Sequence, residues 1–362
     1  MPAPDRSDRR DHPPGTVRLL RRAAVVLIAV GAVALLAPHL AGVPWAAVLA
    51  AVVAVPAVWV VALVVLWAAG LATHTVTLTA AMPGLTHRRA ATLSLTGSFV
   101  ANVLPMGGAA GIAANTMMAR QWGFTGRDVA AYTVVTNVWD VLAKLAVAAV
   151  AAVWVVRAGL ALPGLGTVGA VAGVLVVLVA LVLVSDRAAC LAAAGADRVQ
   201  RLVRPAARRS GATWGREVLH TRRLAAGTAR ERWAGLSAGM VGYTLLLGLL
   251  LAACLHVAGA GVPLAGLVAG FACERLLTLA ALTPGGIGSV ELGMTAVLVA
   301  AGGSPVGVVA GVLLYRLLTF ALEVPVGGAW WLGWLVARRR ARVPALAGAG
   351  AVAGAVGEVT SR

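Results

Sequence analysis

Charged residues are scarce in this sequence of 362 residues. Lys, Arg, Asp and Glu together make up 12% of the chain, whereas hydrophobic residues make up 60%. The mean hydropathy is +0.90. This composition leaves too little polar surface for a soluble globular domain, so that class is excluded. It predicts an all-α polytopic membrane protein, because helices satisfy their own backbone hydrogen bonds in lipid.

Residue types that carry catalysis or bind metals are also few. The three cysteines, Cys190, Cys254 and Cys273, are scattered, without a CxxC pattern or a histidine at ligand spacing. Neither a disulfide framework nor a zinc site is indicated. The GxSxG, HExxH and P-loop patterns are missing as well. We therefore expect no metal, no cofactor and no enzymatic activity.

Acidic residues are outnumbered by basic ones. The chain has 30 Lys and Arg against 13 Asp and Glu, which gives a formal net charge of +17. In a membrane protein this excess is typical of cytoplasmic loops near anionic headgroups. The basic stretches lack interleaved aromatic residues, so we expect no nucleic-acid binding. The richness in Ala, Gly, Val and Arg is typical of a bacterial gene of high G+C content, which favours a bacterial inner membrane protein.

Two apolar stretches are interrupted by proline and glycine. The first interruption reads N-V-L-P-M-G-G-A-A-G from Asn102, and the second reads P-G-G-I-G-S-V-E from Pro284. Neither can continue as a regular helix, and a break at membrane depth survives only inside protein or beside a wet cavity. Paired breaks in two halves of a chain favour a transporter-type site. The candidate site residues in the breaks are Asn102, Pro105, Gly107, Gly108, Pro284, Gly285, Gly286 and Gly288.

The flanks of the breaks predict how each segment enters the membrane. The arms of the first have about 11–13 residues, fewer than the roughly 20 needed to cross. Arg88 and Arg89 precede it and Arg120 and Arg127 follow it, so we expect a re-entrant hairpin from the cytoplasm over residues 92–118. The alternative is a single kinked span with Arg120 and Arg127 outside. Uncharged flanks favour an external entry for the second broken segment, 264–301, and the two halves then form an inverted repeat.

The remaining apolar runs complete the expected topology, with both termini in the cytoplasm. A basic tail (1–22) precedes the first membrane half (23–184), and a basic cytoplasmic connector (185–232) leads to the second half (233–340) and a disordered Ala/Gly tail (341–362). About six full spans are expected, at residues 23–37, 45–70, 129–156, 168–184, 234–258 and 306–336.

Several charged residues fall inside these apolar segments, where each needs a partner or water. Asp140 and Lys144 are four residues apart and share a helix face. This pair is either structural or functional. Half-helix N-termini after Gly108 and Gly286 suit an anionic headgroup, which an arginine would hold through two hydrogen bonds. The charges concerned are Asp140, Lys144, Glu274, Arg275, Glu291, Arg316 and Glu323. Glu291 and Arg316 are expected to pair when the site is empty.

Four stretches together resemble the transmembrane, flippase-like region of lysylphosphatidylglycerol synthases and the stand-alone membrane proteins related to it. The resemblance covers roughly residues 20–340. The stretches are N-V-L-P-M-G-G-A-A-G, V-T-N-V-W-D ending at Asp140, T-P-G-G-I-G-S-V-E ending at Glu291, and L-L-Y-R-L-L-T-F around Arg316. The resemblance implies site roles for Pro105, Gly107, Gly108, Asp140, Pro284, Gly285, Gly286, Gly288, Glu291 and Arg316.

The resemblance implies lipid translocation. The full-length synthases add a soluble aminoacyl-transferase domain, whereas this sequence has only a short tail after Arg340. We expect translocation of an anionic or aminoacylated lipid between leaflets, with a membrane lipid of anionic headgroup as the partner. A homo-oligomer is compatible with the sequence. The alternatives are a membrane-embedded enzyme or accessory subunit acting on a lipid-linked intermediate, and a binding scaffold without transport.

Overall fold

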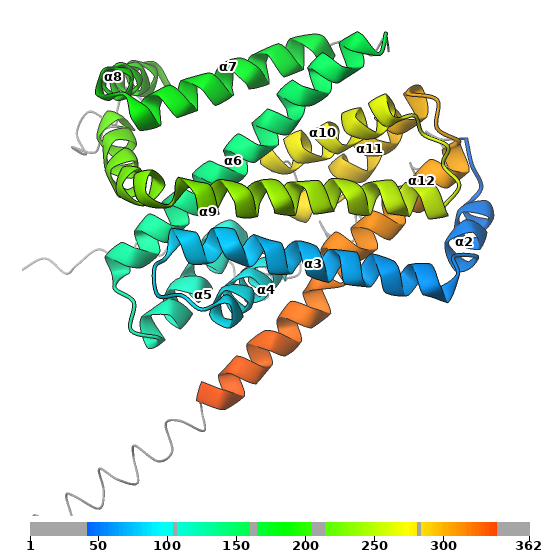
Figure 1. The fold of residues 1–362 in the computed structure, drawn as a ribbon, viewed down its shortest axis with the longest axis horizontal. Helices are drawn as coiled ribbons and strands as arrows, with labels where there is room; N and C mark the ends of the chain where they lie inside the picture. Colours follow the sequence, from blue (N-terminus) through cyan, green and yellow to red (C-terminus); the bar gives the residue numbers. More distant parts are fainter. Residues whose placement is uncertain (1–41, 104–106, 160–164, 204–213, 281–283, 339–362) are drawn as a thin grey trace, which may run out of the picture.

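The computed structural model describes residues 42–103, 107–159, 165–203, 214–280 and 284–338, and this part of the chain is helical without strands (Figure 1). Four helices have the length and hydropathy to cross a membrane: Ala57–Ala81, Gly126–Arg157, Ala226–Val257 and Pro305–Arg338. A bent pair, Gly169–Leu183 with Asp186–Arg198, would make a fifth. The all-helical membrane architecture is thus confirmed, with four or five candidate spans where about six were expected. The expected span at 23–37 and both tails lie outside the described residues.

The predicted second span, 45–70, was wrong in its bounds. Two helices occupy this region, α2 (Trp45–Val53) and α3 (Ala57–Ala81). Pro56 separates them because it has no N–H to continue α2, and its backbone is extended (φ −60°, ψ 143°). At its other end α3 continues past residue 70, because Thr75 and Thr77 are buried against protein. The helix stops before Pro83, where Met82 is extended.

The helices α3 and α9 (Trp214–Val257) pack against each other as an antiparallel pair (Figure 1). Glycines allow the close approach that small residues give to membrane helices. A Cβ atom on Gly70 would lie 3.8 Å from Tyr243, and one on Gly235 would lie 3.2 Å from Ala80. We name the end of the pair that holds Ala81 the first end. The opposite end, where the rings of Trp59 and His256 meet, is the second end.

The first broken segment is a helical hairpin that begins at the first end. Its arms are α4 (His87–Val103) and α5 (Gly107–Gln121), somewhat longer than the predicted 92–118. The arms pack through glycine: a Cβ atom on Gly111 would lie 3.0 Å from the carbonyl oxygen of Gly97. Both arms therefore run side by side.

The second broken segment is a hairpin that begins at the second end, after the loop that follows α9. It consists of α10 (Leu264–Ala280), the short helix η2 (Pro284–Gly286) and α11 (Ser289–Ala300). A Cβ atom on Gly270 would lie 2.5 Å from Leu298, so its two arms also pack through glycine. Because α4 contacts η2, the hairpins enter from opposite ends and meet in the interior.

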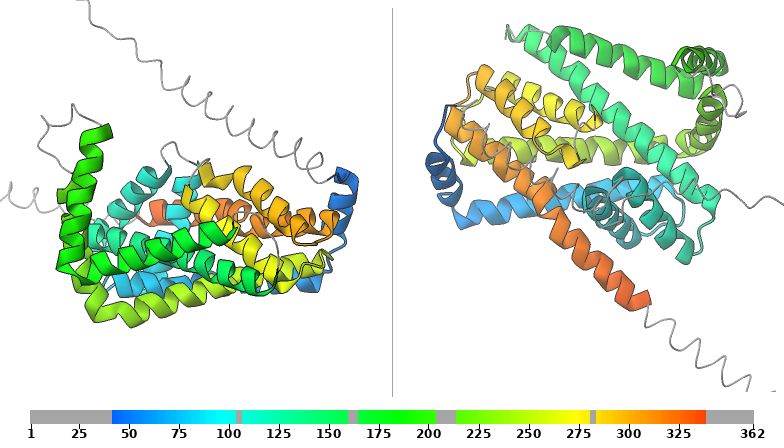
Figure 2. Two further views of the ribbon diagram at one scale, coloured as in Figure 1. Left: turned by 90° about the horizontal axis from the view of Figure 1, so that it is seen from above. Right: turned by 180° about the vertical axis from the view of Figure 1, so that it is seen from behind.

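A long helix follows each hairpin. After the first comes α6 (Gly126–Arg157), whose start is capped reciprocally by Thr125 and Asp128. After the second comes α12 (Pro305–Arg316), which passes through a π-helical turn, η3 (Leu317–Ala321), into a helix over residues 323–338. This last helix extends beyond the bundle in Figure 2, right. Gly327 lies directly against the Leu95 carbonyl of α4.

The described parts of the predicted connector are helical. α7 (Leu165–Val184) is followed by α8 (Asp186–Val203), and the start of α9 follows from Trp214. The chain bends by 114° between α7 and α8. In Figure 2, left, α8 therefore lies at a steep angle to the neighbouring helices. Gly215 N–H donates to Asp197 Oδ1 (2.7 Å), which joins α9 to α8. The predicted boundary at residue 232 coincides with a kink, since Arg232 has φ −127° and ψ 17° within α9.

Candidate functional site

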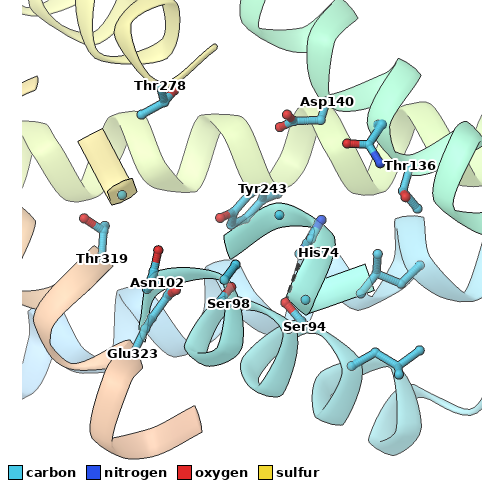
Figure 3. Close-up of a pocket in the computed structure, with 18 of the residues that line it drawn as sticks. His74, Ser94, Ser98, Asn102, Thr136, Asp140, Tyr243, Thr278, Thr319 and Glu323 are labelled. Carbon is cyan, nitrogen blue, oxygen red and sulfur yellow. Dashed lines mark hydrogen bonds between the residues drawn. The ribbon is translucent and has the colours of Figure 1, made fainter. Parts of the chain in front are cut away.

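A polar cavity of about 720 Å³ lies where the two hairpins meet (Figure 3). This volume is in the range of about 300–1,000 Å³ typical of ligand sites. Asn102 and Gly108 reach it from the first hairpin, and Thr278 and Gly285 from the second. Most of the other uncharged polar groups on its wall come from α3, α4, α5 and α6: His74, Ser94, Ser98, Asn115, Tyr132, Thr133, Thr136 and Asn137.

The second break is held by an arginine and a carboxylate. Arg316 Nε donates to Glu291 Oε1 (2.6 Å), and the same guanidinium donates through Nη2 to the Gly285 carbonyl (2.7 Å). The other oxygen of Glu291 accepts from the Gly288 N–H (2.6 Å). Gly285, Gly286 and Gly288 have φ of 63°, 70° and 87°, in the left-handed region that favours glycine. The expected Glu291–Arg316 pair is present.

This geometry corrects one expectation about anion binding. We expected free N–H groups at the N-terminus of the half-helix after Gly286. Glu291 lies in the first turn of α11 and already accepts from Gly288, so the protein's own carboxylate takes the place of an anion there. At the first break, Gly107 and Gly108 begin α5, and a Cβ atom on Gly108 would have no neighbour within 4 Å. In the described part of the first break, the space beside Gly108 is therefore open.

A second buried ion pair lies beside the cavity on α10. Arg275 donates to both oxygens of its neighbour Glu274, and its Nη2 lies 3.4 Å from the Tyr315 hydroxyl. Glu274 is 2% exposed. The Arg275 guanidinium stacks on Phe271, with 5.2 Å from Cζ to the ring centroid. Burial and these contacts hold Arg275 in one position on the wall.

A third ion pair is on α6. Lys144 Nζ lies 2.7 Å from Asp140 Oδ2, as the spacing of four residues predicted. The side chain of Asp140 is 39% exposed and that of Lys144 is 15% exposed. Both line the cavity, so the pair presents its carboxylate to the open space.

Glu323 is a lining carboxylate of a different kind. Among the described residues it forms no ion pair, whereas each lining Lys or Arg is paired with another carboxylate. Its nearest polar neighbours include the Ser98 hydroxyl on α4 and the Trp67 indole on α3. The buried Trp67 N–H has no hydrogen-bond partner of good geometry in the described part of the chain.

The sequence of this chain matches a known protein family. Residues 22–327 match the family described as "Lysylphosphatidylglycerol synthase TM region". The chain belongs to this family. It is a multi-pass membrane protein, and the match covers both hairpins and the helices that follow them. No curated protein and no solved structure matched the chain.

Within this family member, the predicted site residues fall into three groups. The first group lines the cavity: Asn102, Gly108, Asp140, Lys144, Gly285, Arg316 and Glu323. The second group lies outside the lining of the cavity. Glu291 forms the ion pair with Arg316, and the others form the backbone of the breaks: Gly107, Pro284, Gly286 and Gly288. The third is Pro105, which lies outside the described residues. The structure thus brings residues from both breaks to one cavity.

Sequence reasoning missed the part of the wall contributed by α3 and α9. The His74 ring stacks on Tyr243, with 4.5 Å between ring centroids, and its Nδ1 lies 3.5 Å from Ser94 Oγ. The signal was present, because T-H-T-V-T-L-T from Thr73 puts five polar residues into an apolar run. Ser98 and Asn115 have no comparable signal, since isolated small polar residues are common in membrane helices.

Proposed function

We propose that this protein moves the polar headgroup of a lipid between the two leaflets of a bacterial inner membrane. The observation that carries the proposal is the polar cavity between hairpin tips that come from opposite ends of the bundle. Charged and hydroxyl groups at bilayer depth are costly unless they face water or a polar ligand. A headgroup that passes through the cavity is such a ligand.

We infer that both hairpins are re-entrant and form an inverted repeat. The arms α5 and α11 have 15 and 12 residues. At about 1.5 Å per residue they measure roughly 18–23 Å, less than the hydrocarbon thickness of about 30 Å. His87, Arg88, Arg89 and Arg120 lie at the first end, so we assign this end and both termini to the cytoplasm.

Buried apolar residues separate the cavity from both ends of the bundle. At the first end, Leu78, Leu93 and Tyr132 line the cavity and belong to one buried cluster. The second end is filled by a cluster of buried apolar residues contributed by α9, α10, α11 and α12, which includes Leu251, Met294 and Val308. A polar group could not cross this cluster without a rearrangement of the hairpin that forms it.

The wall offers charges of both signs to a headgroup. Arg275, Arg316 and Lys144 present positive groups, and Asp140 and Glu323 present negative ones. We therefore propose an anionic or aminoacylated lipid, whose phosphate and amine would each find a counter-charge. We propose that the lipid leaves the cavity chemically unchanged.

Reconstitution into lipid vesicles tests the proposal. Translocation of a fluorescent lipid should be faster with the protein than in empty vesicles. Asn137→Trp places a large side chain into the cavity from α6 and should slow translocation. Val153→Trp is the matched control, because Val153 is on the same helix, 57% exposed on its outer face. Equal rates for the two variants would contradict the proposal, and mass spectrometry of the lipids checks that they are unchanged.

A further inference from the structure

The cavity contains one carboxylate more than its ion pairs account for. Lys144 is paired with Asp140, Arg275 with Glu274 and Arg316 with Glu291. Glu323 lines the same cavity and forms no ion pair in the described part of the chain. With the cavity empty, these seven groups carry a net charge of −1. A charge at this depth is unfavourable, so the site favours a cation that enters from solution.

The position of Glu323 follows from how the last helix packs on α4. Trp330 Nε1 donates to Thr92 Oγ1 (3.0 Å), and Gly327 lies against Leu95, so the two helices are antiparallel. One turn before Gly327, Glu323 consequently faces the later part of α4, where Ser98 and Asn102 line the cavity. Glu323 also follows the π-helical turn at Leu317–Ala321, a feature often found at functional sites.

Oxygen atoms predominate around this carboxylate. Ser98 contacts it from α4, and Asn102 lines the same part of the wall (Figure 3). Thr319 is one turn before Glu323, and its hydroxyl donates to the Tyr315 carbonyl (2.9 Å). That bond leaves the Thr319 oxygen free to accept. Carboxylate, hydroxyl and amide oxygens are the ligands that hard cations prefer.

The other charged and titratable groups near Glu323 do not neutralise it. Arg316 and Arg275 act on it across the cavity, but each is held by its own carboxylate. From α3 and α9 the stacked pair of His74 and Tyr243 faces the cavity. From α6 the facing charges are Asp140 and Lys144, which pair with each other.

We propose that Glu323 binds one monovalent cation, a proton or a sodium ion, and that movement of this cation drives lipid translocation. The proposal rests on the proposed function and adds its energy source. A cation at Glu323 cancels the net charge of the cavity, so the loaded site changes conformation without carrying an uncompensated charge. In many secondary transporters, the site for the coupling cation lies at the interface between two repeats.

Binding is measured without transport, by thermal unfolding of the full chain in detergent. A cation that binds only the folded protein raises the Tm. Wild type should unfold at higher temperature in sodium chloride than in choline chloride of equal ionic strength if the cation is sodium, or at acidic pH if it is a proton. Glu323→Gln should lose that shift and Glu323→Asp should retain part of it. Glu231→Gln, an exposed carboxylate on α9, is the control.

Transport is measured in vesicles with an imposed proton or sodium gradient. The gradient should speed translocation by wild type. The Glu323→Gln variant should respond to neither gradient. A wild type that translocates lipid equally fast with and without either gradient overturns the cation proposal and leaves the proposed function standing. A full gradient response in Glu323→Gln also overturns it, as does an effect of Glu323→Gln confined to amine-bearing lipids. Absence of any translocation by wild type contradicts the proposed function instead.

Discussion

Arg316 on α12 binds both sides of the second break. It pairs with Glu291 after the break and donates to the Gly285 carbonyl within it, at 2.6 and 2.7 Å. The side chains of Arg316 and Glu291 are 9% and 13% exposed, so the pair is nearly dry. One arginine thereby joins the carbonyl of the break to the first turn of α11.

Removal of one partner should destabilise the protein. Glu291→Gln leaves the Arg316 charge buried without its counter-ion, which typically costs about 3–5 kcal/mol. Arg316→Lys keeps the charge, but an ammonium cannot replace the guanidinium at both Glu291 and the Gly285 carbonyl. We expect the Tm in detergent to fall for both variants, less for the lysine. Glu217→Gln on the exposed start of α9 is the control. A Tm for Glu291→Gln equal to that of this control would refute the structural role.

The glycines of the two breaks should differ in their tolerance of alanine. Gly285 has φ 63°, and a Cβ atom there would overlap the Phe320 ring. The left-handed conformation alone costs alanine about 1–2 kcal/mol, and the overlap adds to this. Gly108→Ala is the matched control at the first break, because it has open space and begins a helix. Thermal melts followed by circular dichroism should show a lower Tm for Gly285→Ala and an unchanged Tm for Gly108→Ala. An equal fall in Tm at both positions would contradict this geometry.

The two ends of the bundle should lie on opposite sides of the membrane. Gln121 ends α5 at the first end, and Ser304 precedes α12 at the second end, and both are exposed. In a variant without Cys190, Cys254 and Cys273, a single cysteine at each position should react with an impermeant reagent from opposite sides. Reaction of both from the same side of intact vesicles would eliminate the inverted-repeat interpretation.

The pair on α6 should matter more for transport than for folding. An exposed pair at this spacing contributes about 0.2–0.5 kcal/mol to a helix. Exchange of the two residues, Asp140→Lys with Lys144→Asp, retains the pair but moves the carboxylate. We expect this double variant to keep the wild-type Tm and to lose most lipid translocation in vesicles. Wild-type translocation by the exchanged protein would make the pair purely structural.

Local signals in the sequence were sufficient for the breaks and for the charges that pair across them. Proline and clustered glycines located both hairpin tips, and spacing alone predicted Asp140 with Lys144. Pro56 is an equally clear signal, yet its apolar neighbours concealed the end of α2. Hydropathy responds to composition, and both α2 and the first half of α3 are made of apolar residues.

Other parts of the site depend on long-range packing. Nothing local to Glu274 and Arg275 indicates that adjacent residues on α10 form a buried pair that also reaches Tyr315. The unpaired state of Glu323 likewise depends on which arginines are already occupied elsewhere. The π-helical turn before it depends on a one-residue shift of backbone hydrogen bonds, seen in Leu322 N–H donating to Leu317. Such a shift cannot be predicted from the residue types.

Each hairpin is attached to the bundle at one end only. In the proposed re-entrant arrangement, a shift of the tip at Asn102 would leave Arg88, Arg89 and Arg120 in water, because they lie at the far ends of α4 and α5. The tip at Gly285 is held by Arg316. A full span could shift by the same distance only by dragging one charged flank into hydrocarbon, at a cost of several kcal/mol per charge. In the proposed re-entrant arrangement, a shift of the tip at Asn102 would change the surroundings of the few polar groups at that tip and leave the charged flanks where they are.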